Sequence, residues 1–312
     1  AITLPLALMR MRERAGLFFS FVIGRTFFQA GMTLYLLSQS ASVTSILIAS
    51  LSATILQASA LALWQAKAAG IRPRLKELHP IGIYGLPLLG SGLCMFALNG
   101  VDRWAIAHFD ELSALGLYSV GAKFALATVL LMQPFGMWWR PQRFARLDQC
   151  PRDCSRILMT GLLLLAVMSA GVICFAPVLM QWLMPENYSA AIAMAIAIAL
   201  MFTLREAAEI VNLGVLSKNN TVTLLKINIG SAVLGLIVCI SATARFGVWG
   251  CIYSLIAIQL LRTLLVFIAS QRTAPLHLPV RTLLLLMTGL AGCALVASTF
   301  APPVTVYSQL SL

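Results

Sequence analysis

The chain has 312 residues, of which 60% are hydrophobic and only 10% are charged. Average soluble domains are about 45–50% apolar and about 25% charged, so the composition excludes a soluble enzyme and an intrinsically disordered chain and leaves a membrane protein. The formal charge of +12 would indicate nucleic acid in a soluble protein, but in a membrane protein it first indicates loops held in the cytoplasm.

A helix that crosses a bilayer needs about 20 mostly apolar residues. Ile2–Met9 resembles the end of such a helix, and no charged leader precedes it as in a signal peptide. We therefore expect a fragment that lacks its N-terminal helices, or a processed or frame-shifted product. Beyond this segment we expect an all-α chain with about nine transmembrane helices, at residues 16–37, 44–66, 81–101, 114–138, 158–183, 190–213, 226–243, 248–270 and 282–301.

Successive connections between the predicted spans lie on alternate sides of the membrane, and the basic residues are divided unevenly between those two sides. Every second connection, starting with residues 10–15, lies on one side, and this set contains 16 of the 22 basic residues. The connections on the opposite side contain only Arg103 and Arg245. Because cytoplasmic loops have the excess of Lys and Arg, we expect the richer set on the cytoplasmic side. Its members are Arg10, Arg12, Arg14, Lys67, Arg72, Arg74, Lys76, Arg140, Arg143, Arg146, Arg152, Arg156, Lys218, Lys226, Arg272 and Arg281.

The connections themselves are too short to form a soluble domain. The longest outer one, residues 102–113, has a single histidine, and no phosphate-binding loop of the form GxxxxGK[ST] is present in the chain. Most of the seven cysteines lie inside apolar runs, and Cys150 and Cys154 lack the clustered histidines of a zinc site. We therefore expect no cofactor and no metal, and any function must lie in the helices.

Arg25 and Lys123 are basic residues deep inside apolar runs. Arg25 lies roughly 13 Å from the cytoplasmic end of its span, at about 1.5 Å per residue, and Gln29 follows one turn later on the same face. Lys123 lies at a similar depth from the outer end of its own span. A charge at mid-bilayer costs several kcal/mol unless it faces a bundle interior or an aqueous cavity. We therefore favour a cavity role for both residues.

Another predicted span contains charges of both signs. Arg205 and Glu209 lie four residues apart and share a helix face with Asn212, whereas Glu206 points about 100° away. For Arg205 and Glu209, the sequence favours equally a self-neutralised pair near the inner interface and a functional role. Arg262 lies in the inner third of its span, and we favour a side chain that extends to the cytoplasm. Basic residues outnumber acidic ones within the spans, four to two, which favours an anionic substrate over a metal or another cation.

Residues 84–146 contain several short motifs that recur together in one family of membrane transporters. They are YGLPLLGSGLCMFALNGVDRWAIAHF and, from Leu115, LGLYSVGAKFALATVLLMQPFGMWWRPQRFARL. The matching elements are the Gly-x-Pro opening, the Asp102–Arg103 pair at the end of that helix, and the Leu-Gly-x-Tyr start of the next. PENYSAA (185–191) is similar to the family's outer turn, and GVWGCIYS (247–254) to its Gly-x-x-Gly helix start. Together these motifs resemble the central helices of polysaccharide flippases, the Wzx-type O-antigen and exopolysaccharide translocases of the multidrug/oligosaccharidyl-lipid/polysaccharide (MOP) exporter superfamily.

The resemblance implies a MATE-like fold of two six-helix lobes, in a chain truncated at its N-terminus. Residues 1–66 would complete the first lobe, and residues 67–80 would be the cytoplasmic loop between the lobes. Residues 81–270 would be the second six-helix lobe, and residues 271–312 an extra transmembrane helix and tail. The two lobes would rock about a central cavity and expose it alternately to each side of the membrane.

The resemblance also implies a substrate. This would be an undecaprenyl-pyrophosphate-linked oligosaccharide, translocated across the bacterial inner (plasma) membrane for polysaccharide or lipopolysaccharide synthesis. Partners would be the lipid bilayer and other polysaccharide-assembly proteins, without nucleic acid. Basic cavity residues hold the anionic headgroup in such proteins, and an ion gradient or the membrane potential drives turnover. The resemblance assigns substrate binding to Arg25, Gln29, Lys123 and Arg205, and ion coupling to Asp102, Glu206 and Glu209.

Other functions stay open at the level of the sequence. A membrane-embedded polysaccharide polymerase, glycosyltransferase or acyltransferase would need acid–base groups in an outer loop, where only His108, Asp110 and Glu111 are available. A multidrug exporter of the same superfamily would prefer carboxylates in its cavity. A purely structural membrane subunit is the third alternative. We favour the flippase and expect no enzymatic activity.

Overall fold

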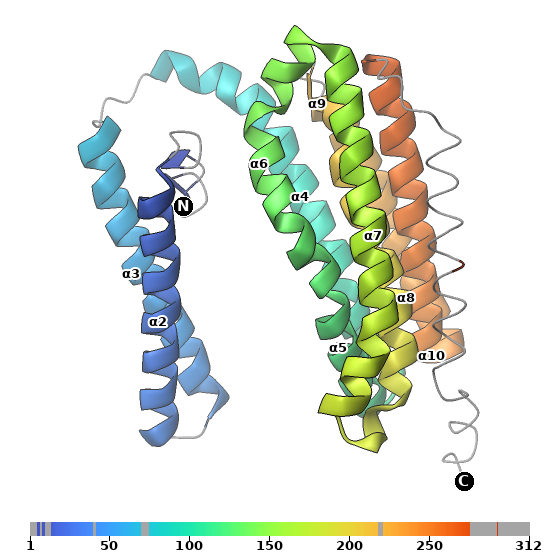
Figure 1. Cartoon of the computed structure of the whole chain (residues 1–312). Helices are drawn as coiled ribbons and strands as arrows, with labels where there is room; N and C mark the ends of the chain where they lie inside the picture. The colour runs from blue at the N-terminus through green and yellow to red at the C-terminus, as the bar shows by residue number, and fades with distance from the viewer. Residues whose placement is uncertain are drawn as a thin grey trace. The chain divides into compact units, whose positions relative to one another are not determined.

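The computed structural model describes residues 5–6, 8–9, 14–39, 42–69, 75–217, 221–274 and 292 (Figure 1). Every described element of regular secondary structure is a helix, which confirms the predicted all-α class. The chain divides into two compact units, Ala1–Leu78 (unit 1) and His79–Leu312 (unit 2). The predicted helix at 282–301 lies outside the described residues, apart from Gly292.

Two long helices form most of the described part of unit 1. α2 (Ala15–Gln39) and α3 (Val43–Ala69) are packed against each other. Two contacts fix their antiparallel register, because Arg25 donates from Nη2 to the hydroxyl of Thr54 at 3.3 Å and Gln57 donates from Nε2 to the carbonyl of Phe21 at 3.2 Å. Both contacts come from polar side chains that an apolar helix pair would otherwise leave unsatisfied.

Unit 2 is a helical bundle with α8 at its centre. α8 contacts α5, α6, α7 and α10. Its residues 190–202 are apolar on every face and none of them is exposed, as expected for a helical segment that is enclosed on all sides. Its alanines let neighbours approach closely, since a Cβ on Gly121 of α5 would lie 3.0 Å from backbone atoms of Ala191 and Ala195. The elements are α4 (Leu75–Phe109), which begins in unit 1 and continues into unit 2, followed by α5 (Leu112–Ala125), α6 (Ala127–Gln149), α7 (Pro151–Leu183), the short 3₁₀ helix η1 (Glu186–Tyr188), α8 (Ala190–Val211), α9 (Leu213–Ser217) and α10 (Thr221–Thr273).

α10 is a helical hairpin rather than one straight helix. Its backbone leaves helical geometry at Gly247, where φ is +58° and ψ is −147°, a conformation that suits glycine. The first arm (221–246) and the second arm (248–273) lie side by side, with the sulfur atoms of Cys239 and Cys251 3.5 Å apart. Asp110, from the turn between α4 and α5, accepts the backbone N–H of Val248 at 2.7 Å and caps the second arm.

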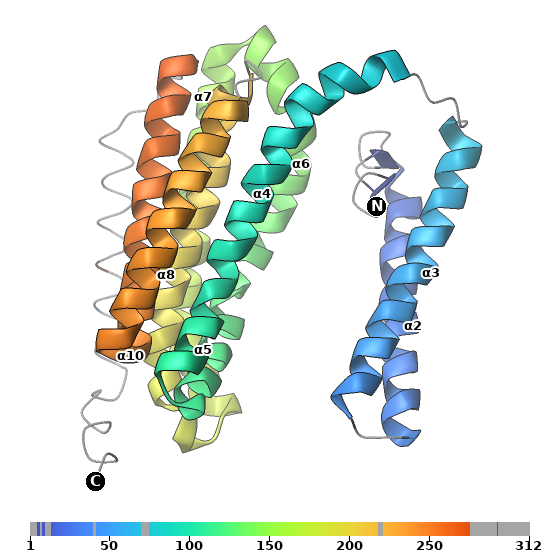
Figure 2. The same cartoon turned by 180° about the vertical axis from the view of Figure 1, so that it is seen from behind.

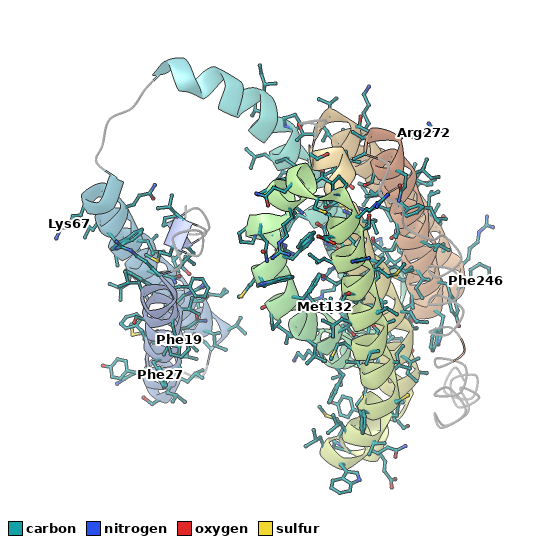
Figure 3. The ribbon with its side chains drawn as sticks, turned by 45° about the horizontal axis from the view of Figure 1, so that its top comes forward. Phe19, Phe27, Lys67, Met132, Phe246 and Arg272 are labelled. Atoms are coloured by element: carbon teal, nitrogen blue, oxygen red, sulfur yellow. The ribbon has the colours of Figure 1, made fainter. Side chains whose placement is uncertain are left out.

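The two ends of unit 2 differ in charge. The α6–α7 turn, α9 and the C-terminal end of α10 lie together at what we call the basic end, and the α4–α5 turn, η1 and the bend of α10 lie at the opposite, acidic end (Figures 1 and 2). Figure 3 shows Phe246, the last residue of the first arm, at the bend of α10 and Arg272 near the C-terminal end of the second arm. This arrangement agrees with the sequence expectation that the basic connections share one side of the membrane. The basic end contains Arg140, Arg143, Arg146, Arg152, Arg156 and Arg272, and the acidic end contains Asp110, Glu111, Glu186 and Arg245.

Six helical segments of the described chain are long and apolar enough to cross a membrane. Large apolar side chains are exposed along them, among them Phe27 (75%), Phe175 (68%) and Trp182 (87%). Soluble proteins do not expose contiguous apolar surface on this scale, so the chain is a multi-pass membrane protein. The six segments are Gly16–Gln39, Val43–Lys67, Leu112–Leu147, Pro151–Leu183, Glu186–Ser217 and Thr221–Thr273.

The predicted count of nine helices is not confirmed. One of the six segments is the α10 hairpin, which contains the two predicted spans 226–243 and 248–270. α4, which contains the predicted span 81–101, is not among the six. The lobes of the MOP fold stay a prediction.

Two predicted connections are largely helical. In the region 67–80, α3 continues to Ala69 and α4 begins at Leu75. In the region 102–113, α4 continues to Phe109, so the turn is confined to Asp110 and Glu111. A helix can extend beyond its apolar run because its backbone hydrogen bonds form whatever the polarity of the side chains. Asp102 and Arg103 therefore lie on a helix and not in an outer loop.

Candidate functional site

Polar side chains from several helices form a network inside unit 2. At its centre is Arg262 on the second arm of α10, whose side chain is only 3% exposed. Nη2 of Arg262 lies 3.0 Å from Oε1 of Glu209 on α8, and its Nε donates to Oδ1 of Asn228 on the first arm at 2.9 Å. Nδ2 of Asn228 donates in turn to the hydroxyl of Ser91 on α4. The network therefore joins α4, α8 and both arms of α10.

The network continues from Glu209 to α6. Nδ2 of Asn212 donates to Oε2 of Glu209 at 3.1 Å, and Nη1 of Arg143 donates to Oδ1 of Asn212 at 3.4 Å. The side chain of Glu209 is 42% exposed, in contrast to its buried partner Arg262. Glu209 is thus a point where the buried network reaches the surface of unit 2.

The structure corrects two expectations about these charges. Spacing along α8 paired Arg205 with Glu209, but Glu209 is paired with Arg262, and Nε of Arg205 lies 4.0 Å from Oε1 of Glu206. Arg262 was expected to extend to the cytoplasm, and instead it is buried and neutralised. Its partners come from α8 and the other arm of α10, which spacing along one helix cannot reveal.

A cavity of about 180 Å³ lies between α4, α5, α8 and the second arm of α10. Asp102 is a fixed acceptor in its wall, because the hydroxyl of Tyr118 donates to Oδ2 at 2.5 Å and the backbone N–H of Arg103 donates to Oδ1 at 2.8 Å. The guanidinium of Arg205 lies over the ring of Phe202, 4.6 Å from its centre. The polar lining consists of Asn99, Asp102, Arg103, Tyr118, Arg205 and Gln259.

Gln259 is, with Tyr118, one of the two most deeply buried polar residues of this wall. It is 1% exposed, yet its Oε1 has no hydrogen-bond partner among the described residues. A buried acceptor without a partner costs about 1–3 kcal/mol. Because Oε1 is itself buried, this cost falls on the helix packing around the cavity wall.

Arg25, Gln29 and Lys123 lie apart from this cavity's lining. Lys123 is exposed on α5, and no hydrogen bond or ion pair joins it to another described residue. Its neighbour Ala122 lines the cavity. Arg25 donates to Thr54, and its buried Nε has no partner among the described residues. Arg25 and half-buried Gln29 belong to unit 1, so the structure does not gather the predicted binding residues into one site.

Sequence reasoning assigned no role to Ser91, Tyr118 or Asn228. The signal for Asn228 was present, because an amide inside an apolar run needs a hydrogen-bond partner within the bundle. Ser91 and Tyr118 gave no comparable signal, since serine and tyrosine occur in apolar helices without a specific partner. Only the packing of α4 against α5 and α10 identifies them.

The residues considered for acid–base chemistry have structural partners. Oδ2 of Asp110 accepts the N–H of Val248, and the ring of His108 is stacked on Trp104, with 5.4 Å between ring centres. Among the described residues, no group of three or more His, Cys, Asp or Glu side chains could hold a metal ion. The short turn therefore contributes to the packing of α4 against the α10 hairpin.

The fold and the polar interior define a class. The chain is an all-helical, multi-pass membrane protein whose second unit contains a buried Arg–Glu–Asn network and a small polar cavity. Comparison with protein-family models, curated proteins and solved structures gives no match for the chain.

Proposed function

We propose that the protein is a flippase that moves lipid-linked oligosaccharide across the bacterial inner membrane for polysaccharide synthesis. One observation carries the proposal. Arg25 and Lys123 lie within helices long and apolar enough to span a membrane, and the described residues offer neither of them a carboxylate. Two unneutralised cations in apolar helices match an anionic cargo that crosses the membrane.

Two other cations of unit 2 differ from Arg25 and Lys123 because each has a carboxylate nearby. Arg262 is neutralised by Glu209 at 3.0 Å, and Arg205 has Glu206 at 4.0 Å. An unpaired charge deep in the bilayer costs several kcal/mol, so we expect it to have a ligand or another function. A pyrophosphate headgroup supplies the missing negative charge, whereas a cationic drug or a metal ion would raise the cost.

In this proposal the two units belong to two lobes that move relative to each other in alternating access. Binding of the headgroup is proposed for Arg25 and Gln29 of unit 1 and for Lys123 and Arg205 of unit 2. Coupling to an ion is proposed for Asp102, Glu206 and Glu209. Glu209 is the best placed of the three, because its exposed carboxylate is paired with the buried Arg262.

The proposal is tested by surface polysaccharide in a cell that lacks its own flippase. We expect the protein to restore the polysaccharide, and the variants Arg25→Ala and Lys123→Ala to lower it at least about tenfold, because each loses a charge-assisted contact to the headgroup. Arg25→Lys and Lys123→Arg should retain most of it. Lys226→Ala, which removes an exposed basic residue of the first α10 arm, is the matched control and should be unaffected.

Membrane abundance is measured in parallel for each variant. Full restoration by both alanine variants at normal abundance would remove the anionic-headgroup argument. A direct assay accompanies it, in which the purified protein in nanodiscs binds farnesyl pyrophosphate and Lys123→Ala weakens that binding. Absence of pyrophosphate binding by the unaltered protein would contradict the proposed function.

A further inference from the structure

We propose that Cys239 and Cys251 form a disulfide bond that joins the two arms of α10 near their bend. Cys239 lies on the first arm and Cys251 on the second, and their sulfur atoms are 3.5 Å apart. Both are free thiols in the structure. The inference concerns the α10 hairpin alone and does not rest on the proposed function.

The disulfide requires only a small movement of the two sulfur atoms. Bonded sulfurs are about 2.05 Å apart, so the two thiols must approach each other by about 1.5 Å. The backbones of the arms are already in close contact at this level, because a Cβ placed on Gly250 would collide with the carbonyl oxygen of Ala242. Gly250 directly precedes Cys251, and Ala242 lies about one turn after Cys239.

The burial of the pair determines when the bond can form. Both cysteines are 0% exposed and belong to the apolar core of unit 2. Thiol–disulfide exchange requires that the reacting thiol be accessible. We therefore place the reaction before the hairpin packs against α5 and α8. The same burial then protects the finished bond from reductants.

The bond would give the hairpin a second joint between its arms. Towards the basic end, Nε of Arg262 donates to Oδ1 of Asn228 at 2.9 Å, which joins the second arm to the first. Cys239 and Cys251 lie closer to the bend, where apolar residues surround them. A covalent bond needs no polar partner, so it can join the arms in this apolar part of the core.

The bend of α10 lies at the acidic end of unit 2, together with η1 and the α4–α5 turn (Figure 1). The basic end is the one that we expect in the cytoplasm. Cys251 follows the bend by about one turn, and Cys239 precedes it by about two turns. The pair is therefore close to the side of the membrane that faces away from the cytoplasm, where disulfides form and persist.

The oxidant that we assign is a disulfide, R–S–S–R, presented by an oxidoreductase outside the cytoplasm. The thiolate of one cysteine attacks a sulfur of the oxidant, whose S–S bond breaks and releases the other sulfur as a thiolate. The second cysteine then attacks the first cysteine's sulfur in this mixed disulfide and displaces the remaining sulfur of the oxidant. In total the two cysteines lose two protons and two electrons, and the oxidant gains them as two thiols.

The test counts the free thiols of the full chain in the membranes of cells that produce it. Acid stops thiol exchange, and the denatured protein is treated with a maleimide that carries polyethylene glycol and shifts its gel band once for each thiol. The chain has seven cysteines. We expect two fewer labels before reduction than after it. Cys239→Ala should abolish this difference, because Cys251 then has no partner.

A matched control moves one thiol around the same arm. In the double variant Cys239→Ala with Ser241→Cys, the new thiol lies two residues further on, about 200° around the helix, at an exposed position. It therefore points away from Cys251. The number of labels should be the same before and after reduction.

Equal numbers of labels before and after reduction of the unaltered protein overturn the inference. A difference that persists in Cys239→Ala, or that appears in the control variant, overturns it as well, because the packing of the arms then does not select the pair. In cells that lack the oxidoreductase outside the cytoplasm, both thiols should stay free, and a disulfide formed there overturns the assigned oxidant. None of these outcomes depends on polysaccharide restoration or pyrophosphate binding, so the proposed function is tested separately.

Discussion

At the scale of single residues, the buried Arg262 is the feature on which unit 2 depends most. Its guanidinium is 3% exposed and contacts Glu209 and Asn228, which lie on two other helical segments. Removing one partner of a buried ion pair leaves the other charge uncompensated, which is more costly than losing an exposed pair. The pair is therefore expected to hold α8 and the two arms of α10 in register.

A double-mutant cycle measures the interaction between Glu209 and Arg262 and so tests this expectation. Glu209→Ala, Arg262→Ala and the double variant should give a coupling free energy of unfolding of about 1–3 kcal/mol. The same cycle on the exposed pair Asp153 and Arg156, 3.6 Å apart on α7, should give at most about 0.5 kcal/mol. Unfolding is followed by detergent titration in mixed micelles. Equal coupling in the two cycles would show that burial of Arg262 adds nothing.

At the scale of elements, the bend in α10 decides how the second arm returns along the bundle. Gly247 has a left-handed φ of +58°, and a Cβ placed there would lie 2.6 Å from Oδ2 of Asp110. The same carboxylate oxygen accepts the N–H of Val248. A side chain at position 247 would therefore strain the backbone and displace the group that caps the second arm.

Gly247→Ala and Gly230→Ala should change the free energy of unfolding in opposite directions. Gly247→Ala is expected to lower it by about 1–2 kcal/mol, because an L-residue resists this φ. Gly230 lies inside the first arm with no atom within 4 Å of an added Cβ, so Gly230→Ala should raise the free energy by about 0.5–1 kcal/mol. Detergent titration of both variants checks the result, and a shift of the same sign in both would contradict the assigned role of Gly247.

The elements were predictable from the sequence where hydropathy alone determines them. The run 158–183 became most of α7, and the two runs 226–243 and 248–270 became the arms of α10. The ends of α4 were not predictable, because the helix continues past its apolar residues through Asp102 and Arg103 to Phe109. Hydropathy reports contact with lipid, whereas a helix ends where its backbone hydrogen bonding ends.

For the candidate site, the sequence predicted which charged residues lie inside apolar runs but not which of them contact each other. The sequence showed that Arg205, Glu209 and Arg262 are charges in apolar runs, and those runs indicated their depth. It could not show that Glu209 pairs with Arg262 instead of Arg205, because that pairing depends on how α8 packs against α10. The cavity at Asp102 and Gln259 was hidden for the same reason, since four helical segments contribute to it.

At the scale of the whole molecule, charge and hydropathy together determine orientation. Within unit 2 the basic residues of the α6–α7 turn and the end of α10 lie at the end opposite to η1 and the α4–α5 turn (Figure 1). An excess of Lys and Arg holds a connection in the cytoplasm. We therefore predict that the basic end of unit 2 is cytoplasmic and the acidic end faces the other side of the membrane.

Cys150 is a natural reporter for this prediction, because it is exposed at the α6–α7 turn among the arginines of the basic end. In a variant whose other cysteines are replaced by alanine, we expect a membrane-impermeant maleimide to label Cys150 only after the cells are permeabilised. With Cys150 also replaced, Glu186→Cys in η1 should be labelled in intact cells, since Glu186 is exposed at the acidic end. Labelling of Cys150 from outside would reverse the orientation, and with it the side from which the proposed cargo is loaded.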